Sequence, residues 1–132
     1  MSKSNYAENV ILNHRYGGPD YVRPATFYIA LFTAAPNDAG GGTEVAGGSY
    51  ARAAVTNDAT NFPAAVGGVK SNAVAVPFAQ ATAAWGTLTH GAIFDALVGG
   101  NLLDWGALGT PRTINTGDQF VLGIGDIRIS EE

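Results

Sequence analysis

Two histidines and two aspartates are the side chains in this sequence best suited to acid–base chemistry. His14 and His90 are the only histidines, and an imidazole changes its charge close to neutral pH. Neither belongs to an H-E-x-x-H zinc motif or lies beside a G-x-S-x-G nucleophile motif. We therefore interpret His14 as a residue at a helix end and His90 as a hydrogen-bonded histidine of the core or of an interface.

Asp95 and Asp104 flank a glycine pair and are able to face each other across a hairpin. Paired carboxylates hydrolyse glycosides only where a cleft holds the sugar between them, and the sequence shows no such cleft. Gly40-Gly41-Gly42-Thr43 lacks the G-K-[ST] ending of a phosphate loop, and no calcium-loop motif and no cysteine are present. These observations predict a protein that is not an enzyme and that has no catalytic residue, cofactor or metal.

Length and composition favour a single β-rich domain. A chain of 132 residues can bury one core, and 18 glycines with a charged fraction of 14% favour short strands joined by tight turns. A net charge of −4 with seven dispersed basic residues argues against a nucleic-acid partner. No apolar stretch approaches the roughly 20 residues that span a bilayer, so we expect no membrane partner and synthesis in a cytoplasm.

The clearest element is a hairpin between residues 87 and 108. Every second residue of its first arm is apolar or histidine, which predicts one shared strand face. The members of this face are Leu88, His90, Ala92, Phe94 and Ala96. Val98-Gly99-Gly100-Asn101 is expected to form the turn, because glycine tolerates the positive φ that tight turns require. The return arm begins at Leu102.

An amphipathic helix is predicted from Ser4 to Tyr16. Ser4 is a suitable N-cap, and Gly17-Gly18-Pro19 ends the helix. Two roles remain open for it, which are covering one end of a sheet and docking onto a neighbouring subunit.

A central strand is predicted from Ala25 to Ala34, because its residues are apolar on both faces. Either the helix or another chain is then expected to cover its outer face. The glycine-rich loop that follows, Ala35 to Ser49, is long enough to be functional or mobile.

Further strands are expected at residues 50–56, 73–78, 120–124 and 127–129. Pro77 places the second of these at a sheet edge or a strand end. Gly109-Thr110-Pro111 is read as a turn, and Gly125-Asp126 as a bulge or turn that resets the register. The whole pattern predicts a mainly β protein, an antiparallel β-sandwich of about seven or eight strands over residues 25–130, with residues 1–18 forming the helix and its cap.

Three stretches carry a further signal: ALFTAAP from Ala30, TEVAGGSYAR from Thr43, and WGTLTHGAIFDALVGGNLL from Trp85. Together with the capped helix before them, they resemble a family of small tailed-phage virion proteins that are often labelled tail fibre proteins. The resemblance covers nearly the whole chain. It implies a structural protein of the bacteriophage virion, made in the host bacterial cytoplasm, with no catalytic residues.

The sequence has neither the repeats nor the coiled coil of a fibre shaft. A capsid decoration (cement) protein is therefore preferred, with a tail fibre or tail-tip component that contacts the host, or a carbohydrate-binding module, as alternatives. The expected partners are a major capsid or tail protein and further copies of the chain. The side chains expected at these interfaces are Tyr6, Val10, Ile11, Gly41, Gly42, Tyr50, Trp85 and Trp105.

Overall fold

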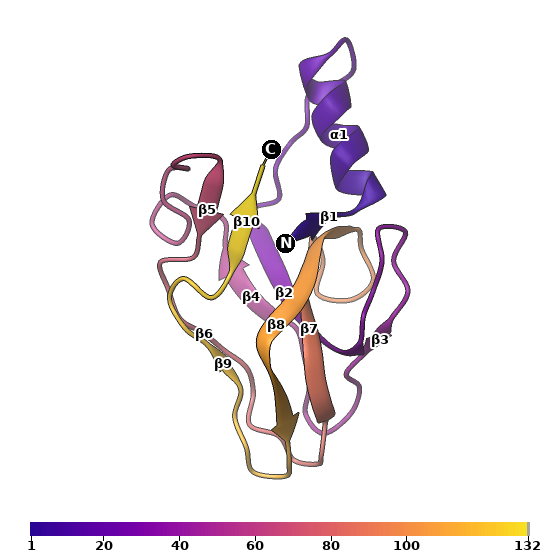
Figure 1. Cartoon of the computed structure of the whole chain (residues 1–132), viewed down its shortest axis with the longest axis vertical. Coiled ribbons are helices and arrows are strands. Elements are labelled where there is room, and N and C mark those ends of the chain that lie inside the picture. Colours follow the sequence, from indigo (N-terminus) through magenta and orange to yellow (C-terminus); the bar gives the residue numbers. More distant parts are fainter. Residues whose placement is uncertain (132) are drawn as a thin grey trace.

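A six-stranded antiparallel sheet forms the centre of the structure, a computed structural model that describes residues 1–131 (Figure 1). The strand order is β1-β8-β7-β2-β3, and β4 pairs with β2 as well. The strands of this sheet are β1 (Ser2–Lys3), β2 (Thr26–Ala34), β3 (Thr43–Glu44), β4 (Ala53–Thr56), β7 (Gly86–Phe94) and β8 (Leu102–Ile114).

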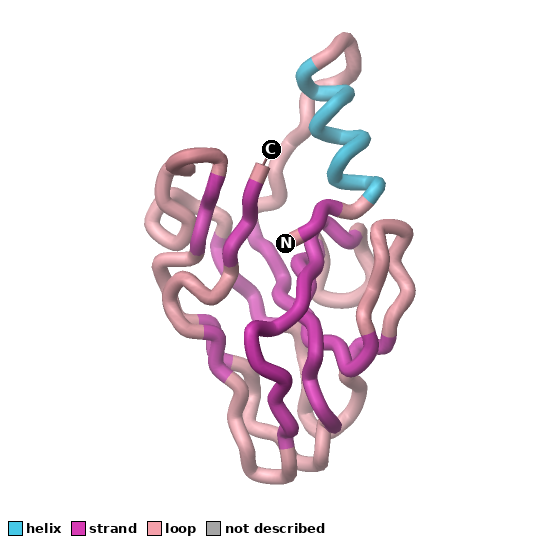
Figure 2. The backbone as a smooth tube through the Cα atoms, in the orientation of Figure 1, coloured by secondary structure: helices cyan, strands magenta, loops and turns pink. Residues whose placement is uncertain are grey.

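Two small antiparallel ribbons form the layer that faces the sheet. β5 (Val69–Ser71) pairs with β10 (Arg128–Ser130), and β6 (Val76–Pro77) pairs with β9 (Val121–Leu122). Figure 2 shows that these strands are short segments between long loops. The predicted mainly β, antiparallel fold is confirmed. Residues 1–131 contain ten strands instead of seven or eight, because several two- or three-residue strands are too short to show an alternating pattern.

The N-terminal helix α1 (Asn5–Arg15) forms as predicted. The Ser4 hydroxyl accepts a hydrogen bond from the Ala7 N–H at 3.1 Å, and Gly17 ends the helix with a φ of 81°. Only Ala7 is buried among the residues of the helix. Figure 1 shows α1 projecting away from the sheet, so the helix does not lie across a sheet face.

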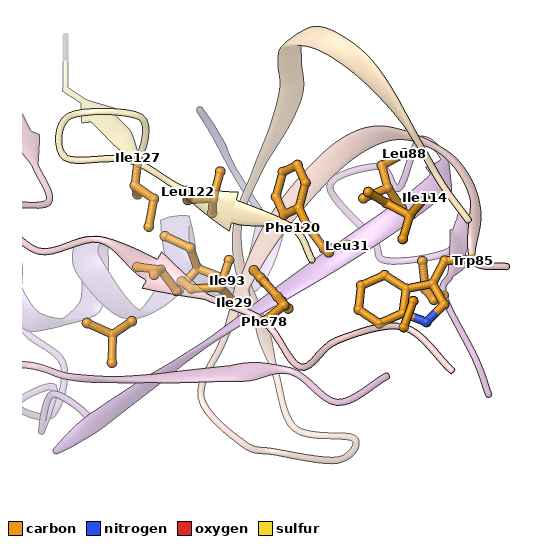
Figure 3. Packing of buried hydrophobic residues seen from close by; sticks show 14 of the residues in the cluster. Ile29, Leu31, Phe78, Trp85, Leu88, Ile93, Ile114, Phe120, Leu122 and Ile127 are labelled. Atoms are coloured by element: carbon orange, nitrogen blue, oxygen red, sulfur yellow. The ribbon is translucent and has the colours of Figure 1, made fainter. Parts of the chain in front are cut away.

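The main core lies between the sheet and the two ribbons. It is built from large apolar side chains of β2, β7, β9 and the segments around them (Figure 3). Members that Figure 3 labels include Ile29, Leu31, Phe78, Trp85, Leu88, Ile93, Phe120 and Ile127. Pro77 stands at the end of β6, as predicted, and Gly125, with a φ of 83°, forms the turn before β10.

A second, smaller cluster lies on the other face of the sheet. Ala30 and Phe32 of β2 contribute to it, together with Ala92 and Leu102. The prediction that β2 is apolar on both faces is therefore confirmed. The expected cover was the helix or another chain. The structure instead shows the Arg52 guanidinium 3.7 Å above the Phe94 ring at the margin of this cluster, so the chain covers part of this face with its own segments.

The predicted common face of the first hairpin arm is wrong. Leu88 lies in the main core, whereas Ala92 and Phe94 belong to the opposite cluster. The cause is a register shift: Leu88 pairs with Arg112 and His90 pairs with Ala107, so Thr89 alone stands opposite residues 108–111. Such a bulge reverses which side chains face the core. The predicted turn at residues 109–111 is this bulge inside β8.

The glycine-rich segment from Ala35 to Ser49 is more ordered than a single loop. Asn37 and Gly40 form a tight bridge, and β3 pairs with β2 through Glu44 and Phe32. Val45 is buried in the main core. These contacts hold the segment against β2 along much of its length.

The β7–β8 turn gives the first testable prediction. Gly99 and Gly100 have φ values of 65° and 73°, as the sequence predicted, and a Cβ on Gly100 would lie 2.6 Å from the Ala96 Cβ. Replacing both by Val should lower the free energy of unfolding by about 1–3 kcal/mol for each strained position. Gly109→Ala is the matched control, because Gly109 has open space and no positive φ. Denaturation curves that are the same for all three proteins would contradict the prediction.

Candidate functional site

The two aspartates of the hairpin do not form a carboxylate pair. Asp95 lies beyond β7 and accepts two hydrogen bonds from Asn101, one from its backbone N–H at 2.6 Å and one from its amide at 2.8 Å. Asp104 lies opposite Ile93 in the β7–β8 ladder. Asp95 therefore caps the loop, and Asp104 belongs to the margin of the core.

The histidines have the places that the sequence suggested. His14 lies in the last turn of α1, where its Nδ1 accepts a hydrogen bond from the Tyr21 N–H at 3.1 Å. His90 is half-buried, with Nδ1 2.8 Å from the Thr89 hydroxyl and its ring centroid 6.4 Å from that of Trp105. Within residues 1–131, no group of three or more metal-ligating side chains occurs. No helix in this part of the chain has the length and apolar character to cross a membrane.

A partly buried ion pair between Glu44 and Arg52, with side chains 25% and 8% exposed, organises the surface beside β3. The Glu44 carboxylate accepts from Arg52 Nη2 at 2.8 Å and from Arg52 Nε at 2.9 Å. Arg52 Nη1 donates to the carbonyl oxygens of Ala96 and Gly99 at 2.9 and 2.8 Å. The pair thus joins β3 to the loop between β7 and β8.

Three of the aromatic residues expected at an interface are tied into the fold. The Tyr50 hydroxyl donates to Glu44 and accepts from the Leu31 N–H, and burial raises the Tyr50 pKa above its ordinary value. Trp85 is only 5% exposed, and its indole N–H donates to the Gly48 carbonyl at 2.9 Å. Trp105 is half-buried and donates to Asp38 at 2.9 Å. Each of the three side chains therefore has a hydrogen-bonding role within the fold that does not require a partner protein.

Gly41 and Gly42 are exposed in the loop that precedes β3. A Cβ on Gly42 would lie 2.6 Å from the Pro36 nitrogen, so the backbone is too close for any side chain at this position. Gly41 meets no such close backbone atom. The turn therefore requires Gly42 irrespective of any partner.

The projecting α1 helix and the chain that follows it form an arm, defined here as residues 4–24. Its base is fixed, because the Ser4 N–H donates to the Leu103 carbonyl and the Asn5 N–H donates to the Asp38 carbonyl, both at 2.9 Å. Its outer part exposes apolar side chains. Leu12 is 55% exposed and Tyr16 is 69% exposed.

The sequence analysis named other residues of this arm. Tyr6 is exposed, whereas Val10 and Ile11 are half-buried. It passed over Leu12 and Tyr16 because both lie away from the apolar stripe of the helix. The signal that identifies them is large apolar side chains on the polar face of an amphipathic helix.

An open groove of about 730 Å³ lies between β8 and the C-terminal strands. Its apolar lining includes Ile29, Ile93, Leu122 and Ile127, which Figure 3 shows in one part of the main core. Arg112 and Arg128 also line it. Sequence patterns did not indicate this groove, because its walls come from segments far apart in the chain.

Asp104 is an incompletely satisfied carboxyl group beside the first strand. Its Oδ1 atom is buried and has no hydrogen-bond partner among residues 1–131. Burial raises the pKa of Asp104 from 3.8 to about 6, although the Lys3 ammonium and the N-terminal amino group act in the opposite direction. Glu131, which forms an ion pair with Lys3 at 2.6 Å, raises this pKa further.

Comparison with known protein families gives one finding for this chain. A family model described as Podophage GP4 fiber I protein gp80 matches residues 2–130. A comparison with curated proteins gives no match.

The Glu44–Arg52 pair leads to a prediction on stability. Arg52→Ala leaves the partly buried Glu44 carboxylate with only its hydrogen bond from Tyr50, and we expect a loss of about 2 kcal/mol in the free energy of unfolding. Arg52→Lys should recover part of this loss, because lysine keeps the positive charge but cannot form the bidentate hydrogen bonds of the guanidinium group. Urea unfolding followed by circular dichroism provides the measurement. Arg112→Ala, at an exposed position, is the control and should change stability by no more than about 0.5 kcal/mol.

Asp104 gives a prediction on pH dependence. Because its pKa is higher in the folded protein than its ordinary value, the folded state binds the proton more tightly. Protonated Asp104 therefore contributes fully to the free energy of unfolding below about pH 4. This contribution is lost as the pH rises to about 6 and Asp104 ionises. Asp104→Asn should therefore stabilise the protein by about 2 kcal/mol at pH 7 and by little at pH 4.

Thermal unfolding at both pH values measures this difference. Glu8→Gln is the control, because Glu8 is exposed on α1 and its replacement should change the melting temperature little at either pH. An equal gain for Asp104→Asn at pH 4 and pH 7 would show that the carboxyl group titrates normally.

Proposed function

The chain belongs to the family described as Podophage GP4 fiber I protein gp80, and from this premise we propose that it is a non-enzymatic module of a virion fibre, attached through its N-terminal arm. As a member of a phage fibre family, the protein is a structural component of the virion. The family description supports the tail-fibre alternative over the capsid decoration that the sequence analysis preferred. The observation that carries the mode of attachment is the exposed apolar outer part of the arm.

The arm has the properties of an attachment element. Backbone hydrogen bonds fix its base to Leu103 and Asp38, so the arm is presented in one orientation. Tyr16 is the C-cap of α1, and its backbone N–H donates to the Leu12 carbonyl at 2.9 Å, so both residues lie at the outer end of the helix. The Arg15 guanidinium lies 5.4 Å from the centre of the Tyr16 ring. Tyrosine and arginine are enriched among the residues that contribute most to binding at protein interfaces.

The occupant of this surface is another protein of the virion. A fibre protein acts in an assembly. The exposed apolar side chains of the arm, residues 4–24, lie away from the sheet of their own chain, so a partner protein is proposed to cover them. Tyr6, Val10 and Ile11 lie nearer the base, and the same partner is proposed to contact them at the margin of the interface.

Capsid decoration is a second candidate function because of one specific observation. Apart from the arm, the described residues form a six-stranded sheet and two facing ribbons, and the sequence has no repeated unit of the kind from which long fibres are built. A small body of this kind also suits a module bound to the face of a capsid.

Incorporation into virions tests the proposed role of the arm. Leu12→Ser combined with Tyr16→Ser should reduce incorporation by about tenfold or more, because the interface loses two apolar anchors, and the folded domain should keep its melting temperature. Val66→Ser is the matched control, because Val66 is an 81% exposed apolar residue on the body. Quantitative mass spectrometry of purified particles measures the copy number.

Electron cryomicroscopy of the same particles separates the two candidate functions. Density for the protein on a tail fibre supports the fibre module, and ordered density across the capsid faces supports decoration. Normal incorporation of the double variant would reject the arm as the attachment element under either function.

A further inference from the structure

One edge of the central sheet is open along most of its length. β8 pairs with β7 on both sides of the bulge at residues 108–111, but on its other side only Asp104 and Trp105 pair, with Lys3 and Ser2 of β1. Residues 106–114 of β8 have no strand partner on this side within residues 1–131. An unpaired edge offers its N–H and C=O groups to another chain.

The direction of these backbone groups follows from the bond between β1 and β8. The Ser4 N–H donates to the Leu103 carbonyl, so Leu103 directs its carbonyl to the outer edge. In an antiparallel pair this orientation returns at every second residue. Ala107, the last residue before the bulge, therefore directs its N–H and C=O groups outward, on the line that β1 already follows.

The open groove lies beside the same edge. Met1 lines it and packs against Gly106, where an added Cβ would lie 3.5 Å from the Met1 Cα and Cγ atoms. β1 thus pairs its backbone with β8, while Met1 just before it lines the apolar groove and donates from its amino group to the Arg128 carbonyl at 3.1 Å. Arg112 and Arg128 line the groove, and neither forms an ion pair with another residue of the range 1–131.

We propose that the β8 edge at residues 106–110 and the adjoining groove bind an extended strand of another virion protein. The strand continues the line of β1 antiparallel to β8. It places apolar side chains at alternate positions in the groove and an acidic side chain against Arg112 and Arg128. This mode of recognition, strand addition, obtains affinity from backbone hydrogen bonds and specificity from the pockets for alternate side chains.

A different protein fits this edge better than a second copy of the chain. Two β8 edges that paired antiparallel around Gly109 would bring Pro111 of each copy against Ala107 of the other. Proline has no N–H to donate and interrupts such a ladder. A partner strand that continues from β1 meets the backbone of Ala107 before the bulge begins. The inference rests on the virion role of the chain and is independent of the role proposed for the arm.

Hydrogen–deuterium exchange tests the proposal on the full chain, isolated and within purified virions. The backbone amides of residues 106–110 should exchange at least about tenfold more slowly in the particle, because they gain hydrogen-bond partners. Equal exchange in the two samples would overturn the proposal. Protection that rises with the concentration of the isolated protein would also overturn it, since a second copy would then be the occupant.

Two sets of variants complete the test. Ala107→Pro removes one outward N–H, and Arg112→Glu with Arg128→Glu reverses the charge of the groove without changing the backbone. Each should reduce incorporation by about tenfold, whereas Lys70→Glu, at an exposed position on β5 outside the groove, should not. If Ala107→Pro fails to fold, the charge reversal alone decides, and normal incorporation of that variant contradicts the proposal. Arm variants should lower incorporation but leave residues 106–110 protected in the copies that remain, so the two proposals can fail separately.

Discussion

The burial of one ion pair, Glu44 with Arg52, is the constraint on which the arrangement around the central strand depends. Removing both charges from water costs several kcal/mol unless hydrogen bonds satisfy them. Arg52 obtains these bonds from Glu44 and from two carbonyl oxygens of the β7–β8 loop. Glu44 in turn accepts from the Tyr50 hydroxyl, which accepts from the Leu31 N–H of β2. One charge pair therefore fixes a short edge strand, the central strand and a distant loop relative to one another.

The bulge in the β7–β8 hairpin determines how the sheet is covered. Because Leu88 lies in the main core while Ala92 faces the other side, a single strand contributes to two apolar clusters. The larger cluster is enclosed by the two ribbons, and the smaller is bordered by Phe94 beneath Arg52 and by Trp105 bonded to Asp38. In a regular ladder Leu88 would share the face of Ala92, while Ile93 would still point into the main core.

A fibre module acts through its contacts, and two parts of this structure remain available for them. The arm presents Leu12 and Tyr16 away from the body, and the edge of β8 presents backbone groups beside an apolar groove. The two differ in physical character. The arm would bind a partner through apolar side chains, whereas the edge of β8 would bind one through backbone hydrogen bonds. Asp104 lies opposite Ile93 and pairs with Lys3 of β1. A change in its charge therefore takes place next to β1, where both the arm and the open edge of β8 begin.

The sequence by itself determined the features that depend on neighbouring residues. Ser4 and Gly17 set the ends of the helix, Gly99 and Gly100 set the turn, and the β class followed from alternation and composition. Tertiary structure alone decided the bulge opposite Thr89, the pairing of Glu44 with Arg52, and the groove. Each of these depends on which distant segments meet, and a two-residue period contains no information about a shift in the partner strand. The exposure of Leu12 and Tyr16 was likewise decided by the fold, in which the helix projects from the sheet, because burial is a property of the assembled structure.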